Sequence, residues 1–398
     1  MAKRQLTQLD VAGKTVLVRV DFNVPIEQGV EIIAQYDQRL RATLPTIDYL
    51  LERDCKVVLC SHLGRPRGKV DEALRLFPVG DRLSVLLGRP VTSLSDCIGP
   101  DVASEVAAME SGQVYLLENL RFHEGEENND DAFSTELAAL ADCFVMDAFA
   151  VAHRAHASTV GLPRMLPSAM GLLMQREVES LGLALTSPER PLAALMGGAK
   201  VSDKILVLEN LLGNLDRLYI GGGMAVTFLA ALGKPVGASP VEADRLDFAR
   251  EVIDRANRGT IELHVPTDIV AASEFEPHPV ESQTFPVDGV PDGWYIMDVG
   301  NATAQSFARG LADCKTIIWN GPMGVFEMER FSAGTRTVAN AIAGLPNVTT
   351  VVGGGSTAEA VEALGLETSM THVSTGGGAS LEFLEGRELP GIAALPDA

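Results

Sequence analysis

The sequence predicts an α/β protein with two units, each built on a mainly parallel sheet covered by helices. Three observations support this fold class. The chain of 398 residues is long enough for two or three domains of about 150 residues. Apolar residues make up 46% of the chain and aromatic residues only 5%, which suits the aliphatic cores of parallel sheets. Short β-branched runs also alternate with segments of helical period along the chain.

In the first half, the expected strands are short apolar runs, and the expected helices show apolar residues at helical spacing. The strands cover residues 15–20, 56–60, 90–94, 113–117 and 143–146, and the helices cover 37–52, 79–87, 101–109 and 132–141. The acidic segment 123–131 is interpreted as a solvated loop. Residues 168–185 predict a connecting helix, and the Pro-containing break after it predicts a domain boundary near residue 187.

A second series of strands and helices follows. Its expected strands cover residues 192–196, 216–220, 261–263, 316–319 and 348–352. Its expected helices cover residues 224–232, 242–258, 302–311, 332–343 and 358–364, with a further helix that ends at 212. Residues 272–293 are rich in Pro and Glu and are expected to form a surface β excursion.

Composition also excludes several classes of function. The formal net charge of −21 argues against nucleic acid or an anionic membrane as the main partner. The five cysteines include no CxxC pair and fit neither a zinc-site spacing nor a disulfide framework, so free thiols in a reducing cytoplasm are expected. There is no apolar signal region and no apolar run of about 18 residues, so a soluble cytoplasmic protein is expected.

Four arginines of the first half stand where a predicted strand ends or the next helix begins. They are Arg39, Arg65, Arg121 and Arg154. Because the carboxyl ends of parallel strands share one edge of a sheet, we expect these side chains to converge. The planar guanidinium binds phosphate or carboxylate oxygens two at a time, so the pattern predicts a site for a phosphorylated ligand. For the basic loop 61–69 alone, a solvated turn is the other interpretation.

Glycine clusters follow three predicted strands of the second half and the short run Val373-Ser374-Thr375. They lie at residues 197–198, 221–223, 353–355 and 376–378. A bare backbone followed by a helix N-terminus is a favourable anion site, although any one cluster taken alone is more typical of a tight turn. Ser356 and Thr357 are expected to cap the helix after the third cluster. Lys200 and Lys204 would share one helix face if their helix begins early.

Several classes of enzyme are excluded because their sequence motifs are absent. The chain has no P-loop, no G-x-G-x-x-G after a strand, no G-x-S-x-G, no protein-kinase motif set and no H-E-x-x-H. What remains suits a phosphoryl transferase acting between a small phosphorylated acid and a nucleotide. Such catalysis depends on positioning and charge neutralisation. A carboxylate acceptor carries no proton, so no general base is required.

Seven motifs in register resemble the phosphoglycerate kinase family and cover essentially the whole chain. They are VDFNVP at 20–25, SHLGRP at 61–66, ENLRF at 118–122, AHRAH at 152–156, GGAKV at 197–201, WNGP at 319–322 and STGGGA at 374–379. The resemblance implies reversible transfer of the acyl phosphate of 1,3-bisphosphoglycerate to ADP, giving 3-phosphoglycerate and ATP, with Mg²⁺. It also implies two Rossmann-like, three-layer lobes joined by a hinge helix, in a monomer with small-molecule partners only.

The resemblance also implies roles for residues at matching positions. Substrate binding would involve Asp21, Phe22, Asn23, Arg39, His62, Leu63, Gly64, Arg65, Arg121 and Arg154. Arg39, Lys200, Gly376 and Gly377 would stabilise the phosphoryl group during transfer. Nucleotide binding would involve Gly198, Lys204, Gly222, Gly223, Pro322, Glu327, Gly353, Gly354, Gly355, Ser356 and Thr357. The implied domains are an N-terminal lobe at 1–168, a connecting helix at 169–186, a nucleotide-binding lobe at 187–380, and a tail at 381–398 that returns to the first lobe.

The chain departs from the family pattern at several positions. Ala150-Val151 stands where Gly-Thr is usual, Val226 where Asn is usual and Asn301 where Pro is usual. Ser356 stands where the family has an aspartate that helps to hold the metal–nucleotide, and a hydroxyl is a weaker Mg²⁺ ligand than a carboxylate. Two alternatives therefore stay open: a binding or scaffold protein that has lost activity, and a kinase for a different small phospho-acid.

Overall fold

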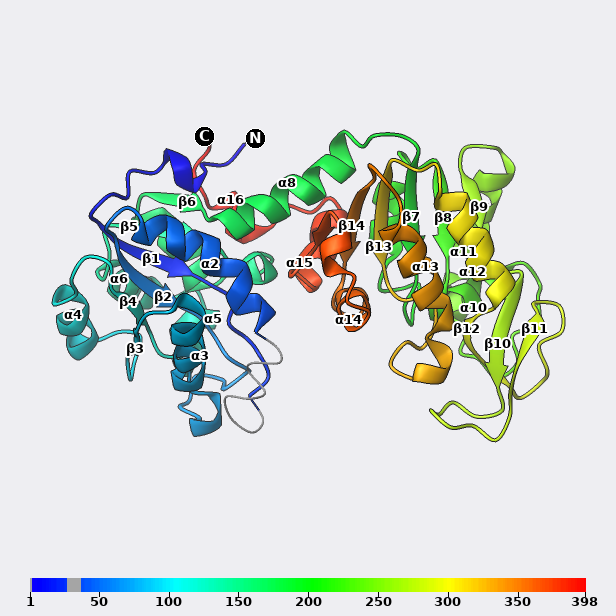
Figure 1. Ribbon diagram of the computed structural model, residues 1–398, viewed down its shortest axis with the longest axis horizontal. Coiled ribbons are helices and arrows are strands. Elements are labelled where there is room, and N and C mark those ends of the chain that lie inside the picture. The colour runs from blue at the N-terminus through cyan, green and yellow to red at the C-terminus, as the bar shows by residue number, and fades with distance from the viewer. Residues whose placement is uncertain (1, 27–36) are drawn as a thin grey trace. The chain divides into compact units, whose positions relative to one another are not determined.

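The computed structural model describes residues 2–26 and 37–398, which form two compact units (Figure 1). The N-terminal unit comprises Met1–Val178 and Glu388–Ala398, and the C-terminal unit comprises Glu179–Arg387. Helix α8 (Leu172–Thr186) contains the division between them. Each unit has one parallel six-stranded sheet with helices on both faces, so the predicted α/β class with two such units is confirmed.

The sheet of the N-terminal unit has the strand order β3-β4-β2-β1-β5-β6. Its strands are β1 (Thr15–Arg19), β2 (Lys56–Cys60), β3 (Val91–Ser93), β4 (Val114–Leu116), β5 (Cys143–Met146) and β6 (Ser168–Met170). Its helices are α2 (Gln38–Leu51), α3 (Phe77–Leu87), α4 (Pro100–Ala107), α5 (Glu124–Glu127), α6 (Asp131–Ala138), α7 (Leu162–Met165) and α16 (Pro390–Ala393). Most strands are buried on both sides, which explains why they appear as continuous apolar runs.

The sheet of the C-terminal unit has the order β15-β14-β13-β7-β8-β9. Its strands are β7 (Leu192–Met196), β8 (Arg217–Ile220), β9 (Glu262–His264), β13 (Thr316–Asn320), β14 (Thr349–Gly353) and β15 (His372–Val373). Its helices are α9 (Ile205–Leu211), α10 (Gly222–Ala231), α11 (Leu246–Asn257), α12 (Asn301–Leu311), α13 (Ala333–Ala343), α14 (Gly355–Ala363) and α15 (Gly378–Leu384). An antiparallel sheet of β11 (Ser282–Pro286), β10 (Asp268–Ala272) and β12 (Tyr295–Val299) accompanies it, and only its β11 segment falls wholly within the expected β excursion.

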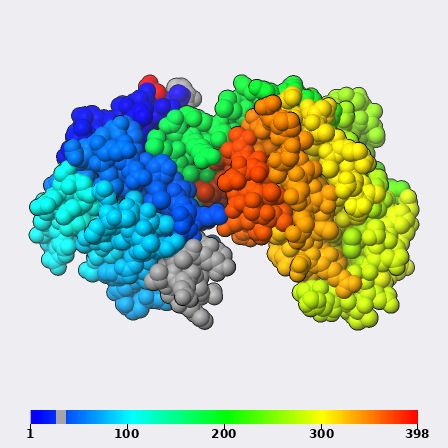
Figure 2. Space-filling model, in the orientation of Figure 1, coloured from blue at the N-terminus to red at the C-terminus, as the bar shows by residue number. Residues whose placement is uncertain are grey.

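The last residues of the chain lie against the first ones within the N-terminal unit. Lys3 Nζ forms an ion pair with Asp397 Oδ1 at 3.0 Å, and the Arg4 amide donates to the Pro396 carbonyl at 2.9 Å. Figure 2 shows the two ends of the chain side by side. The C-terminal segment is therefore part of the folded N-terminal unit.

Two local predictions for the N-terminal unit were wrong. The acidic segment 123–131 is not all loop, because Glu124–Glu127 forms the short helix α5 and buries Glu126 completely. The helix expected to start at residue 168 starts at Leu172, since Ser168–Met170 pairs with β5 as an edge strand. Three residues give no alternation that could separate a short strand from a helix.

For the C-terminal unit, the condition for a shared helix face of Lys200 and Lys204 is not met, and the predicted hydroxyl cap was wrong. Helix α9 starts only at Ile205, so Lys200 lies outside the helix and shares no helix face with Lys204. Helix α14 starts at Gly355, with Gly354 and not a hydroxyl at the N-cap. Gly354 has a φ of +87°, a conformation open to glycine at low cost, which allows the helix to start earlier than the hydroxyl pattern predicts.

Leu59 tests how far the core of the N-terminal unit depends on close packing. Its side chain is fully buried in the central strand β2, beside Val18 of β1 and Leu116 of β4. We expect Leu59→Ala to lower the free energy of unfolding by about 2–5 kcal/mol. Val85→Ala, at a position that is 67% exposed, should change it by about 0.5 kcal/mol or less. Chemical denaturation of both variants checks this, and equal effects would contradict it.

Candidate functional site

The loops after β1, β2 and β4 meet at the carboxyl edge of the N-terminal sheet. The Phe22 amide donates to Ser61 Oγ at 2.9 Å, and the Gly64 amide donates to Asn23 Oδ1 at 2.9 Å. The loop after β2 is in turn fixed to the next one, since the Leu63 amide donates to Asn119 Oδ1 at 3.2 Å. These hydrogen bonds hold Phe22, Asn23, Leu63 and Gly64, which are expected substrate residues, at one edge of the sheet.

His62 lies at the centre of this edge among positive charges. Its side chain is buried, and burial together with the nearby Arg19, Arg121, Arg154 and Arg39 holds its pKa well below the usual range. The imidazole is therefore neutral at pH 7. Arg19 Nη2 lies 3.2 Å from His62 Nδ1 and has only donors to offer, so Nδ1 accepts and the proton is on Nε2.

Arg121 has a buried guanidinium group whose hydrogen-bond donors are only partly satisfied. Its guanidinium is buried, donates to the Gly64 carbonyl from Nη1 at 2.7 Å, and places Nε 3.3 Å from Glu127 Oε1. Nε and Nη2 nevertheless have no hydrogen-bond partner. Burial, and next the charge of Arg154, lower the Arg121 pKa to about 10. Buried donors without acceptors are costly, and an anion with several oxygens would satisfy them.

The other two predicted arginines differ in their surroundings. Arg39 Nη1 forms a 2.5 Å ion pair with Asp21 Oδ2, so these two residues are already joined in the structure. Arg65 is exposed, and no hydrogen bond or ion pair of its side chain is found in the part of the chain that the structure describes. The structure thus brings Arg39, Arg121 and Arg154 together around His62 and leaves Arg65 at the surface.

Three buried residues of this site were missed by the sequence analysis. Arg19 is fully buried and donates from Nε to Ser158 Oγ at 2.8 Å. The Ser158 hydroxyl in turn donates to Glu126 Oε1 at 2.6 Å, and Glu126 is fully buried as well. An arginine inside an otherwise apolar strand was the available signal for Arg19. Nothing in the acidic run around Glu126 distinguished it from its solvated neighbours.

In the C-terminal unit, the glycine loops meet where the strand order reverses, between β7 and β13. The Gly197 amide donates to the Asn320 carbonyl at 2.9 Å, and the Gly198 amide donates to the Pro322 carbonyl at 3.0 Å. A Cβ added at Gly197 would lie 2.1 Å from the Pro322 oxygen. The Gly222 amide donates to the Met323 carbonyl at 2.8 Å, so part of this glycine pattern serves loop-to-loop packing. Crevices at such a reversal are where ligands bind in open α/β sheets.

Lys204 and Asn320 place polar groups at this reversal. Lys204 precedes α9, and its Nζ donates to Asn320 Oδ1. Burial lowers the Lys204 pKa, and no carboxylate is paired with it among the described residues. Asn320 is fully buried, and its Nδ2 has no hydrogen-bond partner. Asn320 was not predicted as a site residue, although it lies within the WNGP motif.

Residues 353–357 include both buried structural positions and positions exposed to a ligand. A Cβ at Gly354 would lie 3.2 Å from Asn320 Nδ2, so this backbone borders the unpartnered amide. Thr357 is buried and accepts the Gly321 amide at 2.6 Å, which is a structural role not foreseen for this expected nucleotide residue. Gly355 and Ser356 are exposed, and the first turn of α14 contains no acidic residue. Ser356 is thus the side chain that this turn offers to a ligand at the predicted metal position.

The remaining predicted residues lie at the surface or in loops. Lys200 and Glu327 are exposed, and no ion pair of either is found in the described part of the chain. Gly377 precedes α15 with a φ of +50° and has open space at its Cβ position. The Gly376 amide already donates to Ser374 Oγ at 3.1 Å. For the Gly376 amide to donate to a ligand, its hydrogen bond to Ser374 would first have to break.

Comparisons with known proteins agree with this picture. The family model described as "Phosphoglycerate kinase" matches residues 6–387. Phosphoglycerate kinases of Moorella thermoacetica and Synechococcus elongatus are 53% and 51% identical, and each match covers 100% of both chains. Among solved structures, phosphoglycerate kinase from Coxiella burnetii matches with a TM-score of 0.87 and 40% identity, covering 98% of both chains. The Pyrococcus horikoshii OT3 enzyme matches with a TM-score of 0.85, 35% identity and the same coverage.

The two unsatisfied donor nitrogens of Arg121 give a prediction for stability. Because two of its donors are buried without acceptors, and because its ion-pair partner Glu127 is 42% exposed and can be solvated, we expect Arg121→Met to raise the unfolding free energy of the ligand-free protein by about 1 kcal/mol. Inorganic phosphate should stabilise the parent protein and have little effect on this variant. Thermal and urea unfolding with and without phosphate measure both effects.

Arg82→Met is the matched control. Arg82 is a well-paired arginine of the same unit, with Nη2 2.5 Å from Asp37 Oδ2, so its loss should destabilise the protein and leave the effect of phosphate unchanged. A destabilised Arg121→Met variant that still responds to phosphate like the parent would contradict the assignment.

Proposed function

We propose that this chain, which belongs to the phosphoglycerate kinase family, binds the phosphorylated acid on its N-terminal unit and the nucleotide on its C-terminal unit. Its activity is phosphotransfer with a carboxyl group as acceptor. The reaction moves the acyl phosphate of 1,3-bisphosphoglycerate to ADP and gives 3-phosphoglycerate and ATP, reversibly. The scaffold alternative is not favoured, given 51–53% identity to named kinases over the full chain.

The buried, partly unpartnered Arg121 is the observation that supports the substrate assignment most strongly. A phosphate group offers the oxygens that Arg121 Nε and Nη2 lack, and Arg154 lies close enough to share its charge. Neutral His62 can donate from Nε2 to the same group, since Arg19 holds its Nδ1. Arg65 would add an exposed guanidinium. We therefore propose that these residues bind the 3-phosphate.

The next loop would bind the glycerate part of the substrate. Asp21 and Asn23 follow β1 directly and supply a carboxylate and an amide for the hydroxyl and carboxylate region, with Phe22, Leu63 and Gly64 forming the adjacent backbone. Arg39 is held at Asp21, close to where the acyl group would then lie. We propose that Arg39 neutralises the phosphoryl group in transfer, together with Lys200 and the amides around Gly376 and Gly377.

The loops at the strand-order reversal would bind the nucleotide. Lys204 carries a charge with no carboxylate partner among the described residues, and it suits the nucleotide phosphates. Exposed Glu327 suits the ribose hydroxyls. The adenine and phosphate surfaces would come from backbone, and the residues assigned to them are Gly198, Gly222, Gly223, Pro322, Gly353, Gly354, Gly355 and Thr357.

Mg²⁺ fits the C-terminal unit only weakly. The first turn of α14 offers the Ser356 hydroxyl and no carboxylate. Mg²⁺ keeps several waters and is commonly bound through substrate phosphates with one or two carboxylates. We propose that this chain takes up Mg²⁺ as part of the nucleotide complex, with Ser356 as a weak additional contact.

Two further proposals concern the state of the protein. The family resemblance implies a monomer with small-molecule partners, and we propose that state for this chain. The five cysteines are free, which supports a reducing compartment such as the cytoplasm. In the part of the chain described by the structure, no helix has the length and apolar character needed to cross a membrane.

The enzyme and scaffold hypotheses differ in one simple measurement. A coupled assay of the purified protein with 3-phosphoglycerate, Mg²⁺ and ATP should show turnover well above a Lys200→Ala control. Turnover no higher than that control would contradict an active enzyme.

The role of Arg39 predicts a specific kinetic change. Because its charge is needed mainly in the transition state, Arg39→Ala should lower kcat by about 10²–10³-fold and change KM for 3-phosphoglycerate much less. Arg41→Ala is the matched control, since Arg41 lies on the same helix and pairs with Asp37 instead. A change confined to KM, or an equal loss in both variants, would contradict this role.

Ser356 gives a second prediction. Ser356→Asp should tighten binding of Mg–ADP by about tenfold, equivalent to about 1.4 kcal/mol, because a carboxylate is the stronger Mg²⁺ ligand. Ser356→Asn is the control, because asparagine has about the size of aspartate but no charge. This variant should bind Mg–ADP like the parent. Isothermal titration calorimetry with ADP, in the presence and absence of Mg²⁺, measures the binding constant of the parent and of both variants. An unchanged or weaker constant in Ser356→Asp would show that the metal is held elsewhere.

A further inference from the structure

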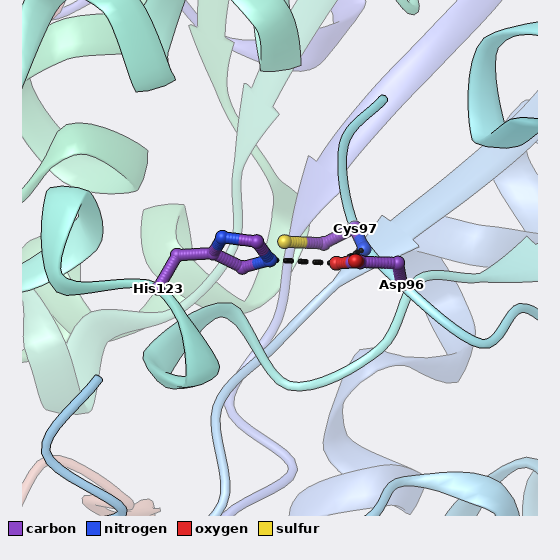
Figure 3. Close-up of side chains that lie close together, drawn as sticks. All are labelled: Asp96, Cys97 and His123. Atoms are coloured by element: carbon purple, nitrogen blue, oxygen red, sulfur yellow. Dashed lines mark hydrogen bonds and ion pairs between the residues drawn. The ribbon is translucent and has the colours of Figure 1, made fainter. Parts of the chain in front are cut away.

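Asp96, Cys97 and His123 bring three different ligand atoms together outside the proposed active site. The carboxylate oxygen, the sulfur and the imidazole nitrogen all lie within 4.8 Å of one another (Figure 3). Asp96 and Cys97 lie between β3 and α4, and His123 directly follows the turn Leu120–Phe122. We propose that these three side chains form a binding site for a zinc-like divalent cation.

The donor set is the first argument for this assignment. Zn²⁺ in proteins is bound by Cys sulfur, His nitrogen and carboxylate oxygen, whereas Mg²⁺ and Ca²⁺ are bound mainly by oxygen. The cluster offers one donor of each kind that zinc uses, and a water can supply the fourth position. The sequence analysis excluded a zinc site because the cysteines lack a paired spacing. Here, however, the fold joins residues that are 26 positions apart.

The distances lie close to those of a bound metal. In a tetrahedral zinc site, bonds of about 2.0–2.3 Å place neighbouring ligand atoms about 3.3–3.6 Å apart. His123 Nε2 and Asp96 Oδ1 are 2.6 Å apart and in direct contact, so they would have to separate by less than about 1 Å. The sulfur lies within 4.8 Å of both, so it would have to approach them by at most about 1 Å.

The surroundings hold the donors in place and leave a route for a cation. The Cys97 amide donates to Asp96 Oδ1 at 2.7 Å, and the Glu118 amide donates to the Asp96 carbonyl at 3.2 Å. The His123 ring packs beside Phe133, with centroids 5.5 Å apart. Cys97 is buried, but the Asp96 side chain is 50% exposed and the His123 side chain 30% exposed. A cation can therefore reach the buried sulfur from the solvent side of this pair.

An acidic cavity adjoins the same loop. Its volume is about 310 Å³, and Asp96, Asp101 and Glu105 contribute to its wall. Carboxylates around a cleft raise the local concentration of cations. On binding, the metal would take Nε2 of the neutral His123 imidazole, whose proton is then on Nδ1, together with the Asp96 carboxylate and the Cys97 thiolate, and the Cys97 thiol proton passes to solvent. Bound metal would join the loop of Asp96 to the turn that carries Arg121.

A titration of the full-length protein tests the proposal. The protein is freed of metal with a chelator, dialysed and titrated with Cd²⁺, while thiolate-to-metal charge-transfer absorption is recorded. We expect one equivalent of Cd²⁺ to give the band in the parent and in Cys314→Ala, which lacks a buried thiol of the other unit. Cys97→Ala should lose the band.

His123→Gln provides a second readout at a partly exposed position, where a folding defect is least expected. Its Zn²⁺ affinity, measured by competition with a zinc indicator, should be at least about tenfold weaker than that of the parent, since even the loss of an outer partner costs 10–100-fold. Absence of the band in the parent, persistence of the band in Cys97→Ala, or unchanged Zn²⁺ affinity in His123→Gln would each overturn the site.

Discussion

A buried positive charge without full compensation is the constraint on which the N-terminal unit depends. Arg19, Arg121 and Arg154 act together on His62, and Arg121 has two donor nitrogens without acceptors. Such a cluster costs free energy in the ligand-free protein, because desolvated charges of one sign repel each other. It persists because the neighbouring loops are tied by side-chain bonds such as Phe22 to Ser61 and Leu63 to Asn119. The phosphate group proposed to bind here would remove that cost and so link the energetics of the fold to substrate binding.

The C-terminal unit relies on backbone more than on charge. Its glycine loops are joined by backbone hydrogen bonds at the reversal of strand order. Residue 197 has to be glycine there, because a Cβ would clash with the Pro322 carbonyl oxygen. What this packing leaves for a ligand is small and specific: the Lys204 ammonium, the unpartnered Asn320 amide and the exposed start of α14. The replacement of a carboxylate by Ser356 falls at that start. One departure from the family pattern therefore falls within the proposed nucleotide site.

Much of this organisation could be predicted from the sequence, and the failures have physical causes. Strands β2, β5 and β7 match their expected bounds, because buried parallel strands are continuous apolar runs. Arg39, Arg121 and Arg154 converge because parallel strands end at one edge. Arg19 was missed because a strand pattern does not show which polar side chain turns inward. The helix start at Gly355 was missed because a glycine with positive φ replaced the expected hydroxyl cap.

The central claim is that the arginine cluster of the N-terminal unit binds the phosphorylated acid. Amide hydrogen exchange with and without 3-phosphoglycerate, with unphosphorylated glycerate as control, tests it most directly. We expect 3-phosphoglycerate, and not glycerate, to increase protection at residues 61–65, 119–123 and 153–159. Protection equally strong with glycerate, or confined to the glycine loops of the C-terminal unit, would contradict it.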